Sequence, residues 1–123
     1  MFAVSEATVP KIHFITRKLY GGAYGVMSPK EFNGDFNYAW PTAEVAVMGA
    51  KGAVEILFRG KNPEHNIKKY EEAFANPLVA SKNGIIDDIV MPDMTRALIA
   101  DNLRTLDHKD LELMPRTHDN CPL

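Results

Sequence analysis

A glycine pair near residue 20 is the part of the chain whose residue types could do chemistry. It follows an apolar segment, residues 12–16, that is typical of a buried strand. Residues 26–32 can start a helix, which Pro29 must disturb. Glycines let a chain turn without a Cβ penalty, and the first N–H groups of a helix have no intrahelical acceptor. The pattern fits backbone donors aimed at an anion, although a plain turn fits it as well. The run reads Tyr20, Gly21, Gly22, Ala23, Tyr24, Gly25.

Stabilising negative charge is the chemistry that such donors would perform. Fixed N–H groups that point to the place where charge develops in a transition state form an oxyanion hole. Other reactive residue types are dispersed: His13, His65, His108 and His118 lie far apart, and Cys121 is the single cysteine. Because no pair has the spacing of a zinc site and no Gly-x-Ser-x-Gly elbow is present, we expect neither a metal centre nor a nucleophile.

Four residues outside the glycine run allow both a functional and a structural interpretation. His13 alternates with apolar neighbours, as expected of a satisfied core or interface histidine. Asp87 and Asp88 could do acid–base work. The preferred interpretation is that one points outward and the other pairs with a base such as Arg96. Trp40 can form the rigid wall of a ligand pocket, or it can simply belong to the core.

Composition and charge are those of an ordinary soluble globular protein. The 123 residues are 46% hydrophobic and 24% charged, and 14 basic against 16 acidic side chains give a net charge of −2. This balance argues against a nucleic acid or a membrane surface as the partner. No apolar run approaches the roughly 18 residues that a membrane helix needs. The first residues have the pattern of neither a secretory signal nor a transit peptide.

The hydrophobic pattern predicts strands that alternate with helices, and therefore an α/β domain. Ala50, Ala53, Val54 and Leu57 recur at helical spacing and predict one apolar stripe. Gly60 and Asn62 are expected to end one helix and to cap the next. The predicted elements are a strand within 9–16, a glycine turn and short helix over 21–32, a strand over 37–48 interrupted at Pro41, helices over 49–58, 63–74 and 77–83, and a buried strand over 85–91.

The C-terminal part is expected to form a long helix followed by a tail. Asp93 is the predicted cap of this helix. Ile99, Leu103 and Leu106 would share one face of it. Residues from about 108 onward are polar and contain two prolines, which indicates a tail.

Longer motifs make a resemblance to a known family specific. They lie at residues 5–11, 15–18, 21–24, 37–44, 47–49, 74–77, 86–89 and 118–123. In these motifs the chain resembles the C-terminal part of the carboxyltransferase (beta) subunit of biotin-dependent acyl-CoA carboxylases, and most of all the propionyl-CoA type. The resemblance implies a crotonase-like spiral of β-β-α units, of which residues 1–123 would form part of one domain, with a tail over 110–123.

The resemblance also implies roles for individual residues. The N–H groups of Gly22 and Ala23 would form one of two oxyanion holes and hold the ureido oxygen of carboxybiotin. Gly21, Tyr24, Gly25 and Trp40 would contact substrate. No side-chain base is needed, and the hole for the thioester enolate would belong to another domain. Propionyl-type members usually carry an acidic residue at the position of Gly25, so the acyl preference stays open.

Partners and alternatives complete the expectation. The implied partners are an acyl-CoA substrate, a biotin-carrying alpha subunit and other beta subunits. Biotin would be carried on the alpha subunit, with none bound covalently here. The location would be the mitochondrial matrix in a eukaryote and the cytoplasm otherwise. The alternatives are a non-catalytic truncated paralogue or assembly module that binds a full-length subunit, and a biotin-dependent acyl-CoA decarboxylase relative. The isolated chain is expected to be inactive.

Overall fold

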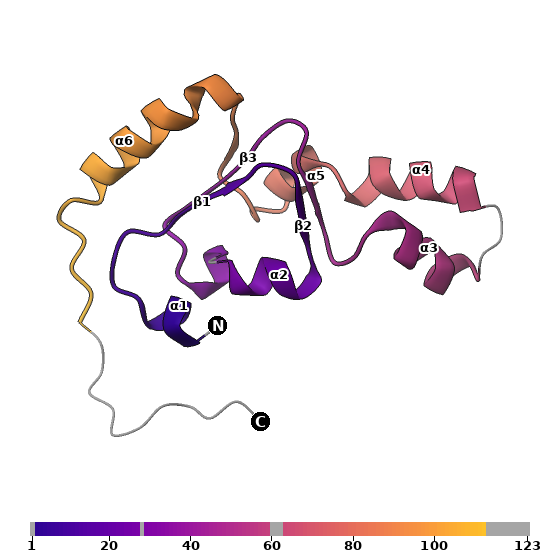
Figure 1. Ribbon diagram of the computed structural model, residues 1–123, viewed down its shortest axis with the longest axis horizontal. Coiled ribbons are helices and arrows are strands. Elements are labelled where there is room, and N and C mark those ends of the chain that lie inside the picture. Colours follow the sequence, from indigo (N-terminus) through magenta and orange to yellow (C-terminus); the bar gives the residue numbers. More distant parts are fainter. Residues whose placement is uncertain (1, 28, 60–62, 113–123) are drawn as a thin grey trace.

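Strands and helices alternate along the chain (Figure 1). The computed structural model describes residues 2–27, 29–59 and 63–112. This order confirms the predicted α/β class. The elements are α1 (Phe2–Glu6), β1 (Ile12–Ile15), β2 (Lys18–Tyr20), α2 (Gly21–Val26), η1 (Lys30–Phe32), β3 (Phe36–Ala39), β4 (Glu44–Ala46), α3 (Ala50–Phe58), α4 (Pro63–Phe74), α5 (Pro77–Lys82), β5 (Asp88–Ile89), η2 (Pro92–Met94) and α6 (Thr95–Thr105).

Two successive β-β-α units organise the first half of the molecule. The first unit is β1, β2 and α2, and the second is β3, β4 and α3. Equivalent strands pair in parallel, because β1 pairs with β3 and β2 pairs with β4. β5 extends the first sheet to the order β1-β3-β5. Each new unit therefore adds a strand to both sheets, which is the geometry of a crotonase-like spiral.

The core lies where the two sheets meet the short helix α5. Its buried members come from β1, β2, β3, β4, α5 and the connections beside them, and Tyr24, Ile85 and Ile89 pack against them. Several members are alanines, which let the two sheets and α5 approach closely. The cluster consists of Ile15, Leu19, Ala39, Ala43, Val45, Ala80 and Ile86.

Helices α3 and α4 form a hairpin that projects from this core (Figure 1). The predicted apolar stripe holds at Ala50, Ala53 and Val54, which are buried. It is wrong at Leu57, which is 64% exposed near the outer end of the hairpin. Here helical spacing identifies the face but not how far the neighbouring helix covers it. Gly60 and Asn62 lie outside the described residues.

The glycine pair lies inside a helix, not before one. We expected a glycine turn followed by a helix near Val26, but α2 begins at Gly21 and ends at Val26. Strand β2 runs directly into it and was missed in the sequence, because a three-residue strand shows no alternation. The interruption at Pro29 is confirmed, since this residue precedes the separate 3₁₀ turn η1. The break at Pro41 between β3 and β4 is confirmed as well.

The C-terminal third departs most from the pattern. The strand expected over 85–91 is confined to Asp88–Ile89. Asp93 lies within η2, and the N-cap of α6 is Met94, which makes no side-chain cap bond among the described residues. Ile99 and Leu103 are 37% and 47% exposed, so the predicted apolar face of α6 is not buried in this chain.

Helix α6 is attached by polar contacts. Its buried residue Asn102 donates a hydrogen bond of 2.9 Å to the Tyr38 hydroxyl on β3. The face of α6 that meets the sheet therefore carries Asn102, where we expected the apolar face with leucine and isoleucine. Within the described part of the chain, no helix is long and apolar enough to cross a membrane.

Candidate functional site

The junction between β2 and α2, called here the β2–α2 corner (residues 20–23), strongly favours glycine at its second position. Gly21 has φ +52°, in the left-handed region that side chains rarely adopt. A Cβ added to Gly21 would also lie 3.1 Å from the Val47 carbonyl oxygen. The left-handed conformation of Gly21 turns the chain from strand to helix within one residue. Its lack of a side chain lets it lie close to the backbone that follows β4.

Gly22 and Ala23 present their backbone at this corner. Both are exposed and both lie in the first turn of α2, where N–H groups have no acceptor within the helix. Among the described residues, Tyr20 at the N-cap makes no side-chain bond that would occupy these donors. The Ala23 carbonyl accepts a hydrogen bond of 3.2 Å from the Met27 N–H, which closes the helix behind them. The corner thus holds two adjacent donors in fixed directions.

An apolar hollow of about 440 Å³ opens beside the corner. Gly21 and Tyr24 form its edge, β4 contributes Val45 and Ala46, and the side chains of α4 and α5 close the other side. The structure therefore brings Gly21 and Tyr24 to this cavity, whereas Gly22 and Ala23, in the same turn of α2, are not among the residues that line it. The lining is Gly21, Tyr24, Val45, Ala46, Val47, Tyr70, Phe74, Val79, Ala80, Asn83 and Ile85.

Gly25 and Trp40 have different surroundings. A Cβ added to Gly25 would meet no described atom within 4 Å, so a side chain fits there. Trp40 lies in a second hollow of about 570 Å³ against α6, and its indole N–H donates a bond of 3.1 Å to the Thr95 hydroxyl. The structure does not bring Trp40 to the hollow beside Gly21. A substrate contact by Trp40 stays a prediction.

Tyr20 and Glu44 form a contact at the corner that the sequence pattern did not indicate. The Tyr20 hydroxyl donates a hydrogen bond to Oε2 of Glu44, and Lys18 Nζ lies 3.7 Å from Oε1 of the same carboxylate. Burial, together with the hydrogen bond and charge of Glu44, raises the pKa of Tyr20 to about 12. The phenol is therefore protonated at neutral pH and acts as a donor.

Asp87, one of the two adjacent acidic residues, has a structural role. Asp87 forms an ion pair with Lys30, not with Arg96 as we expected. Its Oδ2 accepts a bond of 2.8 Å from the Asn37 N–H, and its own N–H donates one of 2.7 Å to the Asn37 carbonyl. Asp87 thus connects β3 to η1. The sequence pattern did not predict this contact, because the residues that make it lie far apart along the chain. Asp88 is exposed, so the expectation that one acid points outward is confirmed.

His13 is less completely bonded than we expected. It lies opposite Asn37 in the β1–β3 pairing. Among the described residues, its Nδ1 is buried without a hydrogen-bond partner. Burial lowers the pKa of His13, and the hydrogen bond with Asn37 opposes that shift only in part. The residues that the structure describes include no group of three or more His, Cys, Asp or Glu placed to hold a metal ion.

The two parallel β-β-α units agree with the class of protein that comparison with known proteins identifies. The chain belongs to the carboxyl transferase domain family, which matches residues 1–121. It is 52% identical over 128 residues to the propionyl-CoA carboxylase beta chain of Cereibacter sphaeroides and 56% identical over 124 residues to the mitochondrial one of Sus scrofa. Both alignments cover 100% of this chain but only 25% and 23% of those relatives. The chain thus spans about a quarter of their length.

Solved structures agree with the family. The hexameric transcarboxylase 12S core, solved with methylmalonyl-coenzyme A and methylmalonic acid bound, matches with a TM-score of 0.91 and 41% identity. That match covers 99% of this chain and 25% of the other. The beta subunit of P. aeruginosa geranyl-CoA carboxylase matches in fold with a TM-score of 0.72 at 24% identity, over 89% of this chain and 24% of that subunit. The described residues therefore have part of a crotonase-like carboxyltransferase fold.

Proposed function

We propose that this chain supplies the biotin-side oxyanion hole of a carboxyltransferase that transfers a carboxyl group to the α-carbon of a short-chain acyl-CoA. The observation that carries the proposal is the β2–α2 corner. There, the exposed residues Gly22 and Ala23 lie in the first turn of α2, where N–H groups have no acceptor within the helix. Gly21 holds the corner in its left-handed conformation.

The two N–H groups would stabilise charge and not move protons. Carboxybiotin, carried by a partner subunit, would supply the carboxyl group and the ring on which negative charge develops. Donors already aimed at the ureido oxygen stabilise that charge without reorganising during the reaction. No side-chain base at the corner is required for this role, which agrees with its composition of Gly and Ala at the two donor positions.

The surroundings of the corner fit such a ring. A Cβ at Gly22 would meet no described atom within 4 Å, so the space beside this residue is open. The adjoining apolar hollow offers space for the apolar part of a ligand, with Tyr24 at its edge. A polar edge at backbone donors beside an apolar cavity is the usual form of a small-molecule site.

The remaining partners follow from the family and are part of the proposal. Acyl-CoA would be the substrate, with Gly25 near the acyl group. A biotin-carrying alpha subunit and other beta subunits would be the protein partners. The proposed location is the mitochondrial matrix in a eukaryotic cell and the cytoplasm otherwise. A decarboxylase relative would use the same two donors, and the direction of transfer distinguishes it.

The test uses a complete enzyme, called here the grafted beta chain. It is a propionyl-CoA carboxylase beta chain in which this sequence replaces the matching C-terminal segment, assembled with its biotin-carrying partner. Ala23→Pro removes one donor and should lower kcat by about 10²–10³ with every acyl-CoA. Ala23→Gly keeps the donor and should cost less than about 1 kcal/mol of transition-state stabilisation.

Two results would overturn the proposal. An Ala23→Pro enzyme with near wild-type rates would exclude Ala23 as a donor. An unsubstituted grafted beta chain that assembles normally but does not turn over would favour a non-catalytic paralogue.

A further inference from the structure

Tyr20 belongs to two elements of the structure. It is the last residue of β2 and the N-cap of α2, so it directly precedes the Gly21 turn and the donors of Gly22 and Ala23. Any shift of the Tyr20 backbone would therefore be transmitted to the first turn of α2. What holds Tyr20 in place thus matters for the direction of those N–H groups.

The ring of Tyr20 is held against the neighbouring β-β-α unit. A Cβ added to Gly49, the N-cap of α3, would lie 3.4 Å from ring atom Cε2, so the ring packs on the bare backbone of that residue. In the parallel pairing of β2 with β4, Tyr20 lies opposite Ala46. Glu44 is two residues before Ala46 and so lies on the same face of the strand.

The hydroxyl of Tyr20 makes the second attachment. It donates to Oε2 of Glu44, whose own backbone N–H donates a bond of 2.6 Å to the Arg17 carbonyl. The carboxylate is thereby held by β4 and by the segment that enters β2. Burial, together with the hydrogen bond and charge of Glu44, raises the pKa of the phenol to about 12, so the hydroxyl keeps the proton that it donates throughout the neutral pH range. Ring and hydroxyl together fix Tyr20 at two points.

We propose that Tyr20 and Glu44 are a positioning pair that sets the direction of the Gly22 and Ala23 N–H groups by fixing the β2–α2 corner against β4. This inference rests on the proposed function of those donors. Neither side chain is required to touch the reacting atoms. Misplacing fixed donors by about 1 Å can cost about 10²-fold in rate, so a weakened anchor should act mainly on kcat.

The experiment measures carboxyl transfer from methylmalonyl-CoA to free biotin by the grafted beta chain. Tyr20→Phe keeps the ring on Gly49 and removes the hydroxyl. It should lower kcat by about tenfold or more while the KM for methylmalonyl-CoA stays within about twofold. Glu44→Leu should have the same effect. The double variant should be no worse than either single variant, because both remove one interaction.

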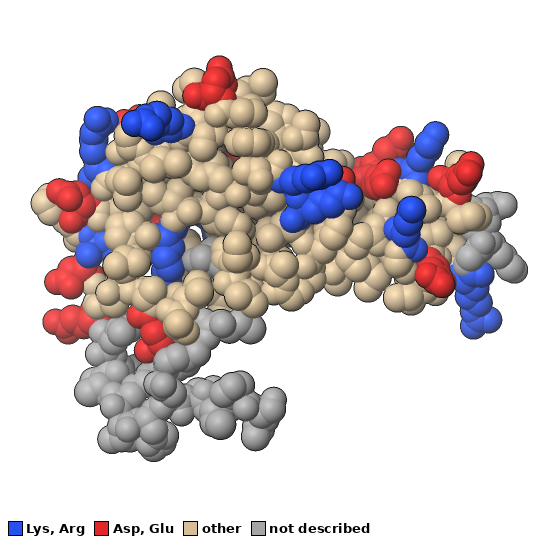
Figure 2. Space-filling model, in the orientation of Figure 1, with Lys and Arg blue, Asp and Glu red and all other residues tan. Residues whose placement is uncertain are grey.

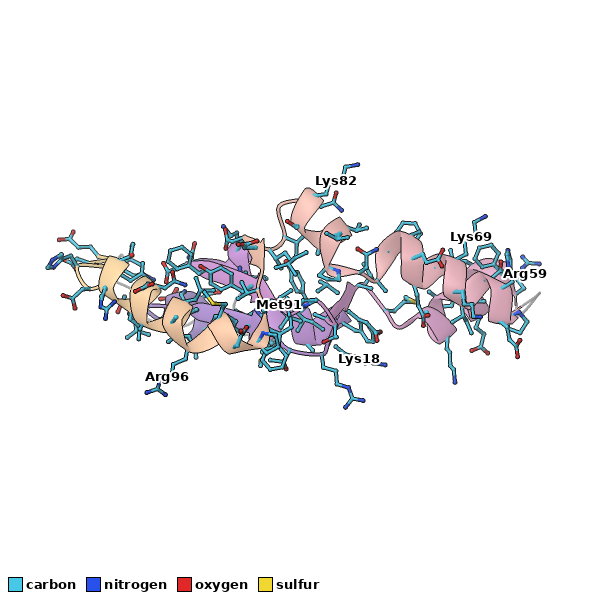
Figure 3. All side chains as sticks on the ribbon, turned by 90° about the horizontal axis from the view of Figure 1, so that it is seen from above. Lys18, Arg59, Lys69, Lys82, Met91 and Arg96 are labelled. Atoms are coloured by element: carbon cyan, nitrogen blue, oxygen red, sulfur yellow. The ribbon has the colours of Figure 1, made fainter. Side chains whose placement is uncertain are left out.

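Two further variants separate positioning from folding. Glu44→Gln keeps an oxygen that can accept the phenol proton, so it should retain most of the rate. Lys18→Gln removes the 3.7 Å contact on the other oxygen of Glu44. The Lys18 side chain is 53% exposed and lies on the outside of the molecule (Figure 3). Its variant should therefore behave as the unsubstituted enzyme.

Each outcome decides the inference. It is overturned if Tyr20→Phe and Glu44→Leu keep kcat within twofold, or if their losses match a lower melting temperature and a raised KM, as a merely structural role predicts. It is also overturned if Glu44→Gln is as slow as Glu44→Leu. Ala23→Pro, measured in parallel, tests the donors themselves, so a failure of the proposed function is distinguishable from a failure of the pair.

Discussion

At the scale of single residues, backbone and side chain have separate tasks at the β2–α2 corner. Gly21 provides a conformation, and Gly22 and Ala23 provide N–H groups that no side chain replaces. We therefore expect Ala23 to tolerate a change that keeps the N–H and not one that removes it. The surrounding side chains of Tyr20 and Glu44 hold this backbone in place.

Gly25 is the residue through which we expect substrate preference to change. A Cβ there meets no described atom within 4 Å, so Gly25→Asp can be built without displacing a neighbour. The new carboxylate would change the charge and size of the site near the acyl group and leave the donors at Gly22 and Ala23 intact. Steady-state rates of the grafted beta chain with acetyl-, propionyl- and butyryl-CoA should show an altered order of kcat/KM. An equal reduction for all three substrates would contradict this role.

His13 should make the stability of β1 depend on pH. Burial lowers the pKa of His13 from 6.5, so the unfolded chain takes up the proton first as the pH falls. Stability is then fully present above pH 6.5 and is lost as the pH decreases from there to the folded-state pKa. Hydrogen exchange of residues 12–15 should therefore be less protected near pH 5 than near pH 7. In His13→Gln, which does not titrate, the difference should be smaller, and an unchanged difference would exclude His13 as its source.

At the scale of elements, short helices depend on their caps more than on propensity. α5 has only six residues, and the side chain of Asn76 accepts a hydrogen bond of 3.0 Å from the Val79 N–H at its start. Pro77 follows at the first helical position, where its missing N–H costs nothing. This cap holds Ala80 in the core and the wall of the apolar hollow that α5 contributes.

Removing the cap of α5 should loosen this wall locally. Asn76→Ala should destabilise the helix by about 1 kcal/mol, because one backbone N–H loses its acceptor. Hydrogen exchange over residues 77–82 of the grafted beta chain should accelerate by roughly fivefold. Asn76→Asp offers an equivalent acceptor and serves as the matched control. Equal exchange in Asn76→Ala and the unsubstituted protein would show that packing, not the cap, holds α5.

At the scale of the whole molecule, much apolar surface lies uncovered. The face in Figure 2 is dominated by uncharged side chains across its middle. Ile56 and Leu57 on α3 are 67% and 64% exposed, and Leu78 on α5 is 70% exposed. We expect exposed large apolar side chains in such number to contact other protein segments. The relatives are about four times as long, and their additional segments can supply such contacts.

The isolated chain should therefore self-associate or unfold readily. Exposed apolar residues on α3, α5 and α6 would drive association, and a chain that covers so little of its surface has a small margin of stability. Analytical ultracentrifugation should detect concentration-dependent oligomers, and a thermal scan should lack a sharp transition. A monodisperse monomer that melts cooperatively would contradict this expectation.

Sequence alone determined the local features of this protein. The α/β order, the breaks at Pro29 and Pro41, and the helices over 50–58 and 63–74 follow from periodicity and from proline, which act within a few residues. The glycine run is a local feature as well, because glycine and small residues that follow an apolar segment can be recognised in the amino-acid sequence. The family was identified from motifs that extend along the whole chain.

Tertiary structure alone decided which distant residues meet. The pairing of Tyr20 with Glu44, of Asp87 with Lys30 and of Asn102 with Tyr38 joins positions separated by many residues, and no local pattern encodes such contacts. It also decided that Leu57, Ile99 and Leu103 lie exposed, because burial depends on what covers a face and not on its period. Both levels act on Gly21. Its residue type is read from the sequence, but the Val47 carbonyl that would crowd a side chain there comes from the other β-β-α unit.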